Sequence, residues 1–311
     1  MSESTVGKSV ERVVVAGGSG FVGRAVTERL RKAGYDVLVL TRSKDLKPSE
    51  EWWDGETVGS WARLLEGSKA VVNLSGAPVT LRWTDENRAL IMDSRVKSTS
   101  AIGQAIRQCK LPPEVWVNAS ALGIYGPTAD APRSENCPVG EGFMAEVCLA
   151  WERAQIEAEV GVVRKVRPRM GIVLGKDEGA FPELAKYTKL YLGGAQGDGR
   201  HWMSWIHLED VAAAYLWAIE KDVEGPFNLV APEPIRNFEF MACLRKVMGR
   251  PWAPPAPAFA IRLVGAIRNM QADVVLEGQR AVPALLLSEG FPFKYEQLEM
   301  ALVDLANPQS A

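Results

Sequence analysis

A glycine-rich segment between an apolar strand and a helix constrains the fold of this chain more than any other feature. Gly17, Gly20 and Gly23 are spaced GxxGxxG, directly after the apolar run VVVA at residues 13–16. In this context the first glycine permits a tight turn, the second lets the backbone approach a pyrophosphate, and the third lets the helix pack close to the strand. The helix N-terminus adds free N–H groups and a partial positive charge. The segment therefore predicts a dinucleotide-binding loop, which also includes Ser19, Phe21 and Val22.

Short β-branched runs alternate with helical periods through the N-terminal half. We expect strands at residues 10–16, 36–40, 70–74, 115–119, 162–167 and 171–174, and helices at residues 24–33, 85–109 and 143–159. Such alternation indicates a parallel sheet with helices on both faces. The predicted fold class is α/β, a Rossmann-like doubly wound parallel sheet with a smaller C-terminal α+β domain.

The pattern loosens after residue 175, where glycines recur in GGAQGDG at residues 193–199 and prolines at residues 250–258. The proline segment is typical of a rigid loop between helices. We expect the Rossmann domain to comprise residues 10–175 and 205–231, and the smaller, substrate-side domain to comprise residues 176–204 and 232–306.

The end of the predicted second strand indicates which dinucleotide is bound. An acidic residue about 20 residues beyond the loop would bind the adenosine ribose 2′-hydroxyl, but this chain has the sequence TRSK at residues 41–44. Its hydroxyls and cations suit a 2′-phosphate, and the planar guanidinium of Arg42 can form paired charge-assisted bonds to phosphate oxygens. We therefore predict NADP(H) rather than NAD(H), bound by Thr41, Arg42 and Ser43. Lys44 could equally be part of a solvated basic turn.

The segment NLSGAP, residues 73–78, ends another predicted strand with small residues. Small side chains at the carboxyl end of a strand leave room for a cofactor to lie across the sheet. Leu74, Ser75 and Gly76 are expected to contact it.

Composition excludes several classes of partner and site. The formal net charge of −2 gives no general attraction to nucleic acid or anionic membrane. No apolar run approaches the roughly 20 residues of a membrane span, and the polar start lacks the core of a signal peptide, so we expect a cytoplasmic protein. Four cysteines without a CxxC pair and two histidines offer little to a metal, and no metal site is predicted.

Motifs along nearly the whole chain resemble those of one enzyme superfamily. They include GGSGFVG, VVNLSGAPV, ASALGIYG, CLAWE, RMGIVLG, SWIHLEDVA and GQRAVPALLLSEGFPF. Together they resemble the extended short-chain dehydrogenase/reductases, specifically the atypical branch called epimerase family 39U. The resemblance implies a Rossmann domain with NADP(H), a small C-terminal domain, an unidentified small-molecule substrate and a possible homodimer. It also implies that Arg95 contacts cofactor phosphate or ribose, the alternative being an exposed helical arginine, and that Val173 lies beside the nicotinamide.

The superfamily's catalytic helix carries a Tyr-x-x-x-Lys pair, commonly followed by a glutamate four residues after the lysine. If Glu152 holds that place, Cys148 stands at the lysine position and Met144 at the tyrosine position. Neither can perform the usual proton transfer, and both side chains suit core packing better.

Two hydroxyl groups remain as catalytic candidates. In ASALGIYG, Ser120 takes the first place of the superfamily's serine pair and Ala121 the second, so Ser120 either reaches the nicotinamide or is a strand-end hydroxyl. Tyr125 matches the loop tyrosine that often lines the substrate pocket. The sequence thus allows an NADP(H)-dependent oxidoreductase or epimerase with non-standard proton donors, or a non-catalytic NADP(H) sensor that regulates a partner.

Overall fold

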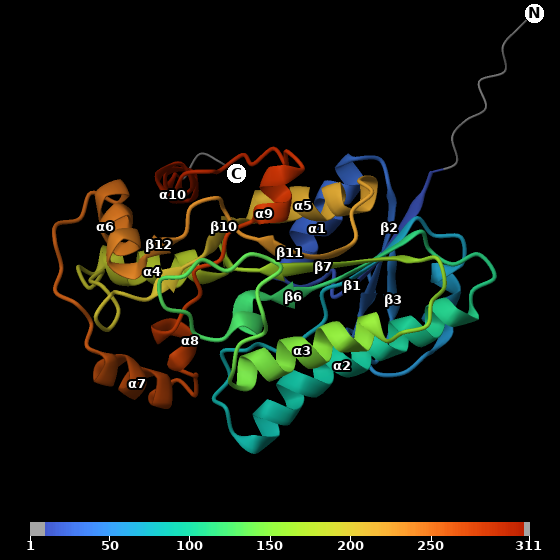
Figure 1. The fold of residues 1–311 in the computed structure, drawn as a ribbon, viewed down its shortest axis with the longest axis horizontal. Coiled ribbons are helices and arrows are strands. Elements are labelled where there is room, and N and C mark those ends of the chain that lie inside the picture. The colour runs from blue at the N-terminus through green and yellow to red at the C-terminus, as the bar shows by residue number, and fades with distance from the viewer. Residues whose placement is uncertain (1–9, 308–311) are drawn as a thin grey trace, which may run out of the picture.

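The computed structural model describes residues 10–307, and a parallel sheet of eight strands forms its centre (Figure 1). The strand order is β11-β7-β5-β4-β1-β2-β3, and β6 pairs with β7. Every pairing in this sheet is parallel. The strands are β1 (Arg12–Ala16), β2 (Asp36–Thr41), β3 (Glu50–Trp52), β4 (Ala70–Asn73), β5 (Val115–Asn118), β6 (Ser120–Ala121), β7 (Arg164–Met170) and β11 (Gly225–Leu229).

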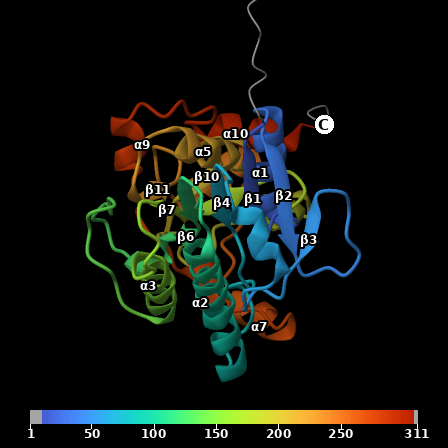
Figure 2. The ribbon, with the colours of Figure 1, turned by 90° about the vertical axis from the view of Figure 1, so that its right-hand side faces the viewer.

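Helices cover both faces of this sheet (Figure 2). On one face lie α1 (Phe21–Lys32), α5 (Leu208–Glu220) and the short α9 (Ala284–Ser288), and on the other lie α2 (Asp85–Gln108) and α3 (Phe143–Ile156). Two 3-10 turns, η1 (Ser60–Leu65) and η2 (Leu122–Tyr125), complete this part. The predicted Rossmann-like α/β fold is confirmed.

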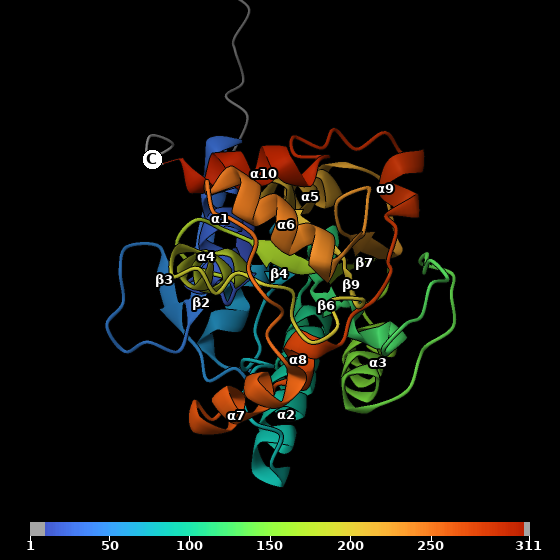
Figure 3. The same ribbon diagram turned by 90° about the vertical axis from the view of Figure 1, so that its left-hand side faces the viewer.

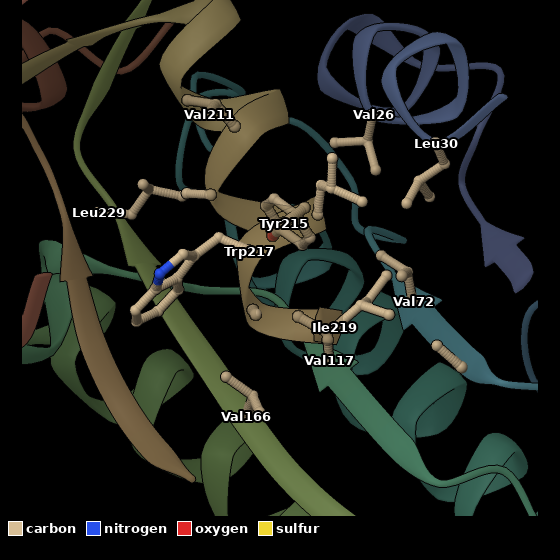
Figure 4. Close-up of a cluster of buried hydrophobic side chains, with 14 of the residues drawn as sticks. Val26, Leu30, Val72, Val117, Val166, Val211, Tyr215, Trp217, Ile219 and Leu229 are labelled. Atoms are coloured by element: carbon tan, nitrogen blue, oxygen red, sulfur yellow. The ribbon is translucent and has the colours of Figure 1, made fainter. Parts of the chain in front are cut away.

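The central strands are apolar throughout because both of their faces are buried. Along β1, Val13 and Val15 face the cluster under α1 and α5, while Val14 faces the cluster under α2. Figure 4 shows the first cluster, in which side chains of α5 and α1 meet valines of the strands. Each fully buried side chain of this kind contributes about 1.5–3 kcal/mol. The cluster includes Val26, Leu30, Val72, Val117, Val166, Tyr215 and Trp217.

The C-terminal part forms a smaller lobe beside one end of the sheet (Figure 1), and this lobe faces the viewer in Figure 3. It contains the short two-stranded sheet of β9 (Trp202–Met203) with β12 (Ile235–Arg236). A second short sheet, β8 (Ile172–Leu174) with β10 (Trp205–His207), connects this lobe to the main sheet, because its residues pack against the apolar clusters of both parts. A separate apolar cluster that includes Trp205 and Phe240 forms the core of this lobe. Its helices are α4 (Ala180–Lys189), α6 (Asn237–Val247), α7 (Ala258–Ile267), α8 (Asp273–Leu276) and α10 (Leu298–Ala306).

Two differences between the structure and the sequence-based expectation bear on the site. Helix α1 begins at Phe21, three residues before the expected start at residue 24, so Gly23 lies inside its first turn. The strand expected at residues 171–174 is β8, which pairs with β10 outside the main sheet. Gly171 explains this departure, because the chain passes so close to β10 that a Cβ there would lie 2.3 Å from the Ser204 carbonyl oxygen.

Among residues 10–307, no helix is both long and apolar enough to span a membrane. The proline segment at residues 250–257 connects α6 to α7, as expected for a loop between helices.

Candidate functional site

The loops after β1 and β4 meet at the carboxyl edge of the sheet. Strand β1 lies between β2 and β4, so the strand order reverses direction here. Such a switch point is where doubly wound sheets bind ligands. A Cβ on Gly17 would lie 2.9 Å from the carbonyl carbon of Leu74, and the Leu74 N–H donates to the Ala16 carbonyl over 2.9 Å. The two predicted cofactor-binding segments are therefore in direct contact.

The glycine loop has the geometry of a pyrophosphate cradle. Gly17 has a φ of +77°, and a Cβ on Gly23 would lie 2.1 Å from the Gly17 carbonyl oxygen. Gly20 is the N-cap of α1, with no side chain capping the helix and no acidic residue in the first turn. The nearest atom to a Cβ on Gly20 would be 3.4 Å away, so this side of the loop is open. An uncapped helix N-terminus of this kind suits a phosphate group.

Buried amides hold the loop after β4. The Asn73 side chain donates to Asn118 Oδ1 over 2.8 Å, and its own Oδ1 accepts the Ser75 N–H over 3.1 Å. The Ala77 N–H donates to Ser94 Oγ of α2 over 2.9 Å. These bonds fix the backbone of Leu74, Ser75 and Gly76 beside the glycine loop.

Thr41 ends β2 beside this cradle, and Arg42 follows it. Thr41 is buried, and its hydroxyl lies 3.5 Å from Ser19 Oγ of the glycine loop and accepts the Ser43 N–H over 3.2 Å. Arg42 is exposed and forms no ion pair with any residue in the described range. The end of β2, where the residues predicted to bind a 2′-phosphate lie, is thus in contact with the glycine loop.

Arg95 lies beneath the loop after β4 and is only 8% exposed, which excludes the alternative of a solvated helical arginine. Its Nη1 donates to the Ile91 carbonyl over 2.9 Å, and its Cζ lies 5.1 Å from the Trp151 ring. A Cβ on Gly76 would come within 3.0 Å of the same Cζ, so the glycine makes room for the guanidinium. Burial lowers the pKa of Arg95.

Met144 and Cys148 lie on the face of α3 that packs against η2. A Cβ on Gly123 would lie 3.1 Å from Met144 Cβ and 3.5 Å from Cys148 Sγ. Burial raises the pKa of Cys148 to about 12, so this thiol stays protonated at physiological pH. Both side chains belong to an apolar cluster with Leu122 and Ile124, in line with the packing role expected for them.

Glu152 and Arg169 form a buried ion pair directly below this cluster. Arg169 donates from Nε to Glu152 Oε1 over 2.8 Å and from Nη2 to Oε2 over 2.9 Å. The Ser120 hydroxyl, which is fully buried, donates to the same Oε1 over 2.7 Å. Although burial acts to lower it, the bonds to Glu152 raise the pKa of Arg169.

Tyr125 extends this network towards β11. Its hydroxyl donates to Asn228 Oδ1 over 2.8 Å and accepts from Arg169 Nη1 over 2.9 Å, and the residue is 3% exposed. Burial raises the pKa of the phenol. The structure thus links Ser120 to Tyr125 through Glu152 and Arg169. Both hydroxyls have protein partners, so their catalytic role stays a prediction.

Sequence reasoning missed Glu152, Arg169 and Asn228 as members of one polar network. A signal was present, because β7 has the sequence RKVRPRM and three of its four basic residues are arginines in a largely buried strand. Buried guanidinium groups require acceptors, and Glu152 on the facing helix is the carboxylate that faces Arg167 and Arg169.

Val173 lies in β8 and His207 in β10, the two paired strands between the main sheet and the C-terminal lobe. In this pairing Val173 is the register partner of Ile206. The sequence HLED at residues 207–210 suggests Asp210 as the cap of the helix that follows His207, but this expectation is wrong. His207 itself is the N-cap of α5, with Nδ1 accepting the Glu209 N–H over 3.1 Å. Asp210 instead accepts the N–H groups of Lys294 and Tyr295 over 2.8 and 3.0 Å, because the C-terminal segment passes beside the first turn of α5.

Comparison with known families matches most of the chain. The model of the NAD dependent epimerase/dehydratase family matches residues 13–229, and a domain of unknown function, DUF1731, matches residues 256–305.

Curated relatives match over nearly their full lengths. The "Epimerase family protein SDR39U1 homolog, chloroplastic" of Arabidopsis thaliana is 36% identical over 300 residues, which cover 93% of this chain and 85% of that protein. "Epimerase family protein ML0860" of Mycobacterium leprae is 34% identical, with 93% and 94% covered.

A solved structure has the same architecture. The crystal structure of human epimerase family protein SDR39U1 (isoform2) with NADPH superposes with a TM-score of 0.86 at 31% identity, covering 95% of this chain and 99% of that one. The loops described above therefore belong to a fold that holds NADPH in a relative.

Proposed function

The chain belongs to the NAD dependent epimerase/dehydratase family, and from that premise we propose that it binds NADP(H) and acts on a small molecule as an atypical oxidoreductase or epimerase. The observation that carries the proposal is the cradle formed by the glycine loop, the uncapped N-terminus of α1 and the loop after β4. We assign cofactor contacts to the residues predicted from the sequence in these segments, together with Arg95 and Val173.

NADP(H) is preferred over NAD(H) in this proposal because of Arg42. It is an exposed guanidinium without an ion-pair partner in the described range, next to the Thr41 hydroxyl at the end of β2. A 2′-phosphate would pair with this guanidinium through charge-assisted hydrogen bonds. The relative solved with NADPH supports the same assignment.

Arg42→Asp tests this preference. We expect wild-type protein to bind NADPH more tightly than NADH, and the variant to lose at least about tenfold in NADPH affinity, since a charge-assisted bond contributes about 1.5–3 kcal/mol. Titration of nicotinamide fluorescence measures both affinities. Lys47→Asp is the matched control, because it makes the same charge change at an exposed lysine outside the TRSK segment. An unchanged preference in Arg42→Asp would show that another group recognises the 2′-phosphate.

When bound, NADP(H) supplies hydride transfer at its nicotinamide. We propose Tyr125 and Ser120 as the groups that move the proton, in the absence of a Tyr-x-x-x-Lys pair at Met144 and Cys148. Arg169 Nη1, 2.9 Å from the Tyr125 hydroxyl, would stabilise a phenolate there. A substrate has to take the place of Asn228 as the partner of that hydroxyl.

Tyr125→Phe tests whether the protein is an enzyme that uses this tyrosine. It should abolish any NADPH oxidation found in a screen of carbonyl compounds and leave NADPH affinity unchanged. Tyr215→Phe, which removes another buried phenol on α5, is the control. Full turnover in Tyr125→Phe would remove this tyrosine from the mechanism.

The second candidate function is an NADP(H) sensor or regulatory binding module. It is favoured by the occupied hydroxyls of Ser120 and Tyr125 and by the protonated, buried thiol of Cys148. NADPH binding without oxidation across a wide panel of carbonyl compounds would support this function over the first.

The remaining expectations also stand as proposals. We propose a cytoplasmic protein that acts without nucleic acid or membrane and can form a homodimer. The domain division at residues 175, 205 and 231 is proposed on the same basis. Size-exclusion chromatography with light scattering measures the oligomeric state.

A further inference from the structure

The turn that follows β8, residues 175–179, lies on the first residue of α1. An antiparallel bridge between Leu174 and Gly179 closes the turn. A Cβ on Gly175 would come within 2.6 Å of the Phe21 ring, and a Cβ on Gly179 within 2.8 Å of it. The ring therefore packs against both glycines, and the turn can approach the phosphate loop this closely only because neither position has a side chain.

Arg24 fastens the same turn to the phosphate loop at a second point. Its Nη1 donates to the Ser19 carbonyl over 2.8 Å, and its Nη2 donates to Glu178 Oε1 over 2.6 Å. The turn is thus held beside the predicted pyrophosphate cradle by two contacts, one with Phe21 and one with Arg24. The Glu178 carboxylate is committed to Arg24.

Lys176 lies in the middle of this turn. Its Nζ is buried and has no hydrogen-bond partner among residues 10–307, and it takes part in no ion pair within that range. A buried ammonium is strongly unfavourable unless an acceptor compensates it. Residues 10–307 supply none, so the acceptor has to come with a ligand.

We infer that Lys176 is a further cofactor-binding residue, whose ammonium binds a pyrophosphate oxygen of the dinucleotide. The inference rests on the proposed NADP(H) function and adds a residue to its site. Pyrophosphate is favoured over the 2′-phosphate because the turn packs on Phe21, the first residue of the uncapped helix α1. Arg42, the proposed partner of the 2′-phosphate, lies instead at the end of β2.

Lys176→Met in the full chain tests the inference, because methionine keeps much of the side-chain length without the charge. We expect NADPH and NADH affinities to fall by the same factor, about 10-fold to 100-fold, as for loss of one charge-assisted bond. Without cofactor, the melting temperature should be equal to or higher than that of the wild type, because the variant removes an uncompensated buried charge. Nicotinamide fluorescence titration and thermal unfolding provide the two readouts.

Two further variants complete the experiment. Lys176→Arg should retain most of the affinity, and Lys189→Met, at an exposed lysine of α4, should change nothing. Unchanged dinucleotide affinity in Lys176→Met would overturn the inference and leave the proposed function intact. A lower melting temperature without cofactor, or a loss confined to NADPH, would also overturn it. Failure of the wild type to bind either dinucleotide would instead overturn the proposed function and the inference with it.

Discussion

Glu152 is a carboxylate that faces two largely buried arginines, Arg167 and Arg169. It accepts two hydrogen bonds from Arg169, and the Nε of Arg167 lies 4.0 Å from its Oε2. Arg167 finds a further acceptor in the Gln155 side chain, over 3.3 Å. A buried charge whose partner is removed costs more than the pair itself contributed, so the stability of this region depends on one side chain.

Glu152→Gln should therefore destabilise the protein strongly. We expect a loss of about 3–5 kcal/mol in the free energy of unfolding, the range for breaking a buried ion pair. Ser120→Ala, which removes only the hydroxyl that donates to Glu152, should lose about 1 kcal/mol. Urea unfolding, monitored by circular dichroism, measures the free energy of unfolding of each variant.

Glu157→Gln is the control for this pair of variants, because Glu157 is an exposed residue at the C-terminal cap of the same helix. It should change the free energy of unfolding by less than about 0.5 kcal/mol. If Glu152→Gln proved as mild as this control, Arg169 would have to find another acceptor in the folded protein.

At the scale of helices and strands, local patterns predicted most of the Rossmann part. The strand and helix positions followed from period and glycine spacing, because each pattern reports the burial of its own segment. The pairing of β8 with β10 did not follow, since it depends on Gly171 meeting residue 204. The same holds for Lys176, because only the packed turn reveals that its ammonium lacks an acceptor.

The N-terminus of α5 combines a helix cap with a titratable group. His207 Nδ1 accepts the Glu209 N–H, its Nε2 lies 3.4 Å from Asp304 Oδ2, and its ring stacks on Tyr295. Lys294, bound to Glu209, also lies nearby. Burial lowers the pKa of His207, although Asp304 and Glu209 act against this. The folded protein therefore holds a neutral imidazole, as the cap requires.

This cap should make folding stability depend on pH. As pH falls below about 6.5, the ordinary pKa of histidine, the unfolded chain takes up a proton before the folded protein does. The contribution of His207 is therefore complete above that pH and is lost below it. His207→Asn keeps a capping side chain that does not titrate, so its free energy of unfolding should fall less than that of the wild type between pH 8 and pH 5.

Urea midpoints at several pH values check this expectation. His201 also has a pKa lowered by burial, so His201→Asn is needed to separate the two histidines. Identical pH profiles for wild type and His207→Asn would mean that the cap does not control the dependence.

At the scale of the whole molecule, Asn228 joins the main sheet to two distant segments. From β11, its side-chain Nδ2 donates to the carbonyls of Arg133 and Val282 over 3.0 and 2.9 Å, and its Oδ1 accepts the Tyr125 hydroxyl. Arg133 belongs to the segment between η2 and α3, and Val282 to the C-terminal lobe. The backbone N–H of Asn228 donates to Glu135 Oε1 over 3.0 Å. One fully buried amide thus fixes both segments over the candidate site.

Asn228→Ala should loosen this junction without unfolding the sheet. Three side-chain hydrogen bonds are lost, so we expect a fall of about 2–4 kcal/mol in the free energy of unfolding. The segment at residues 126–142 contains one tryptic site, Arg133, which is anchored by its carbonyl to Asn228. Trypsin should therefore cut after Arg133 faster in the variant, because local opening exposes the segment more often. Asn87→Ala is the control, because it removes one side-chain hydrogen bond at the start of α2, and it should leave this rate unchanged. Equal rates of cutting in Asn228→Ala and in the wild type would show that the segment is held by its backbone bonds to residues 278–282 alone.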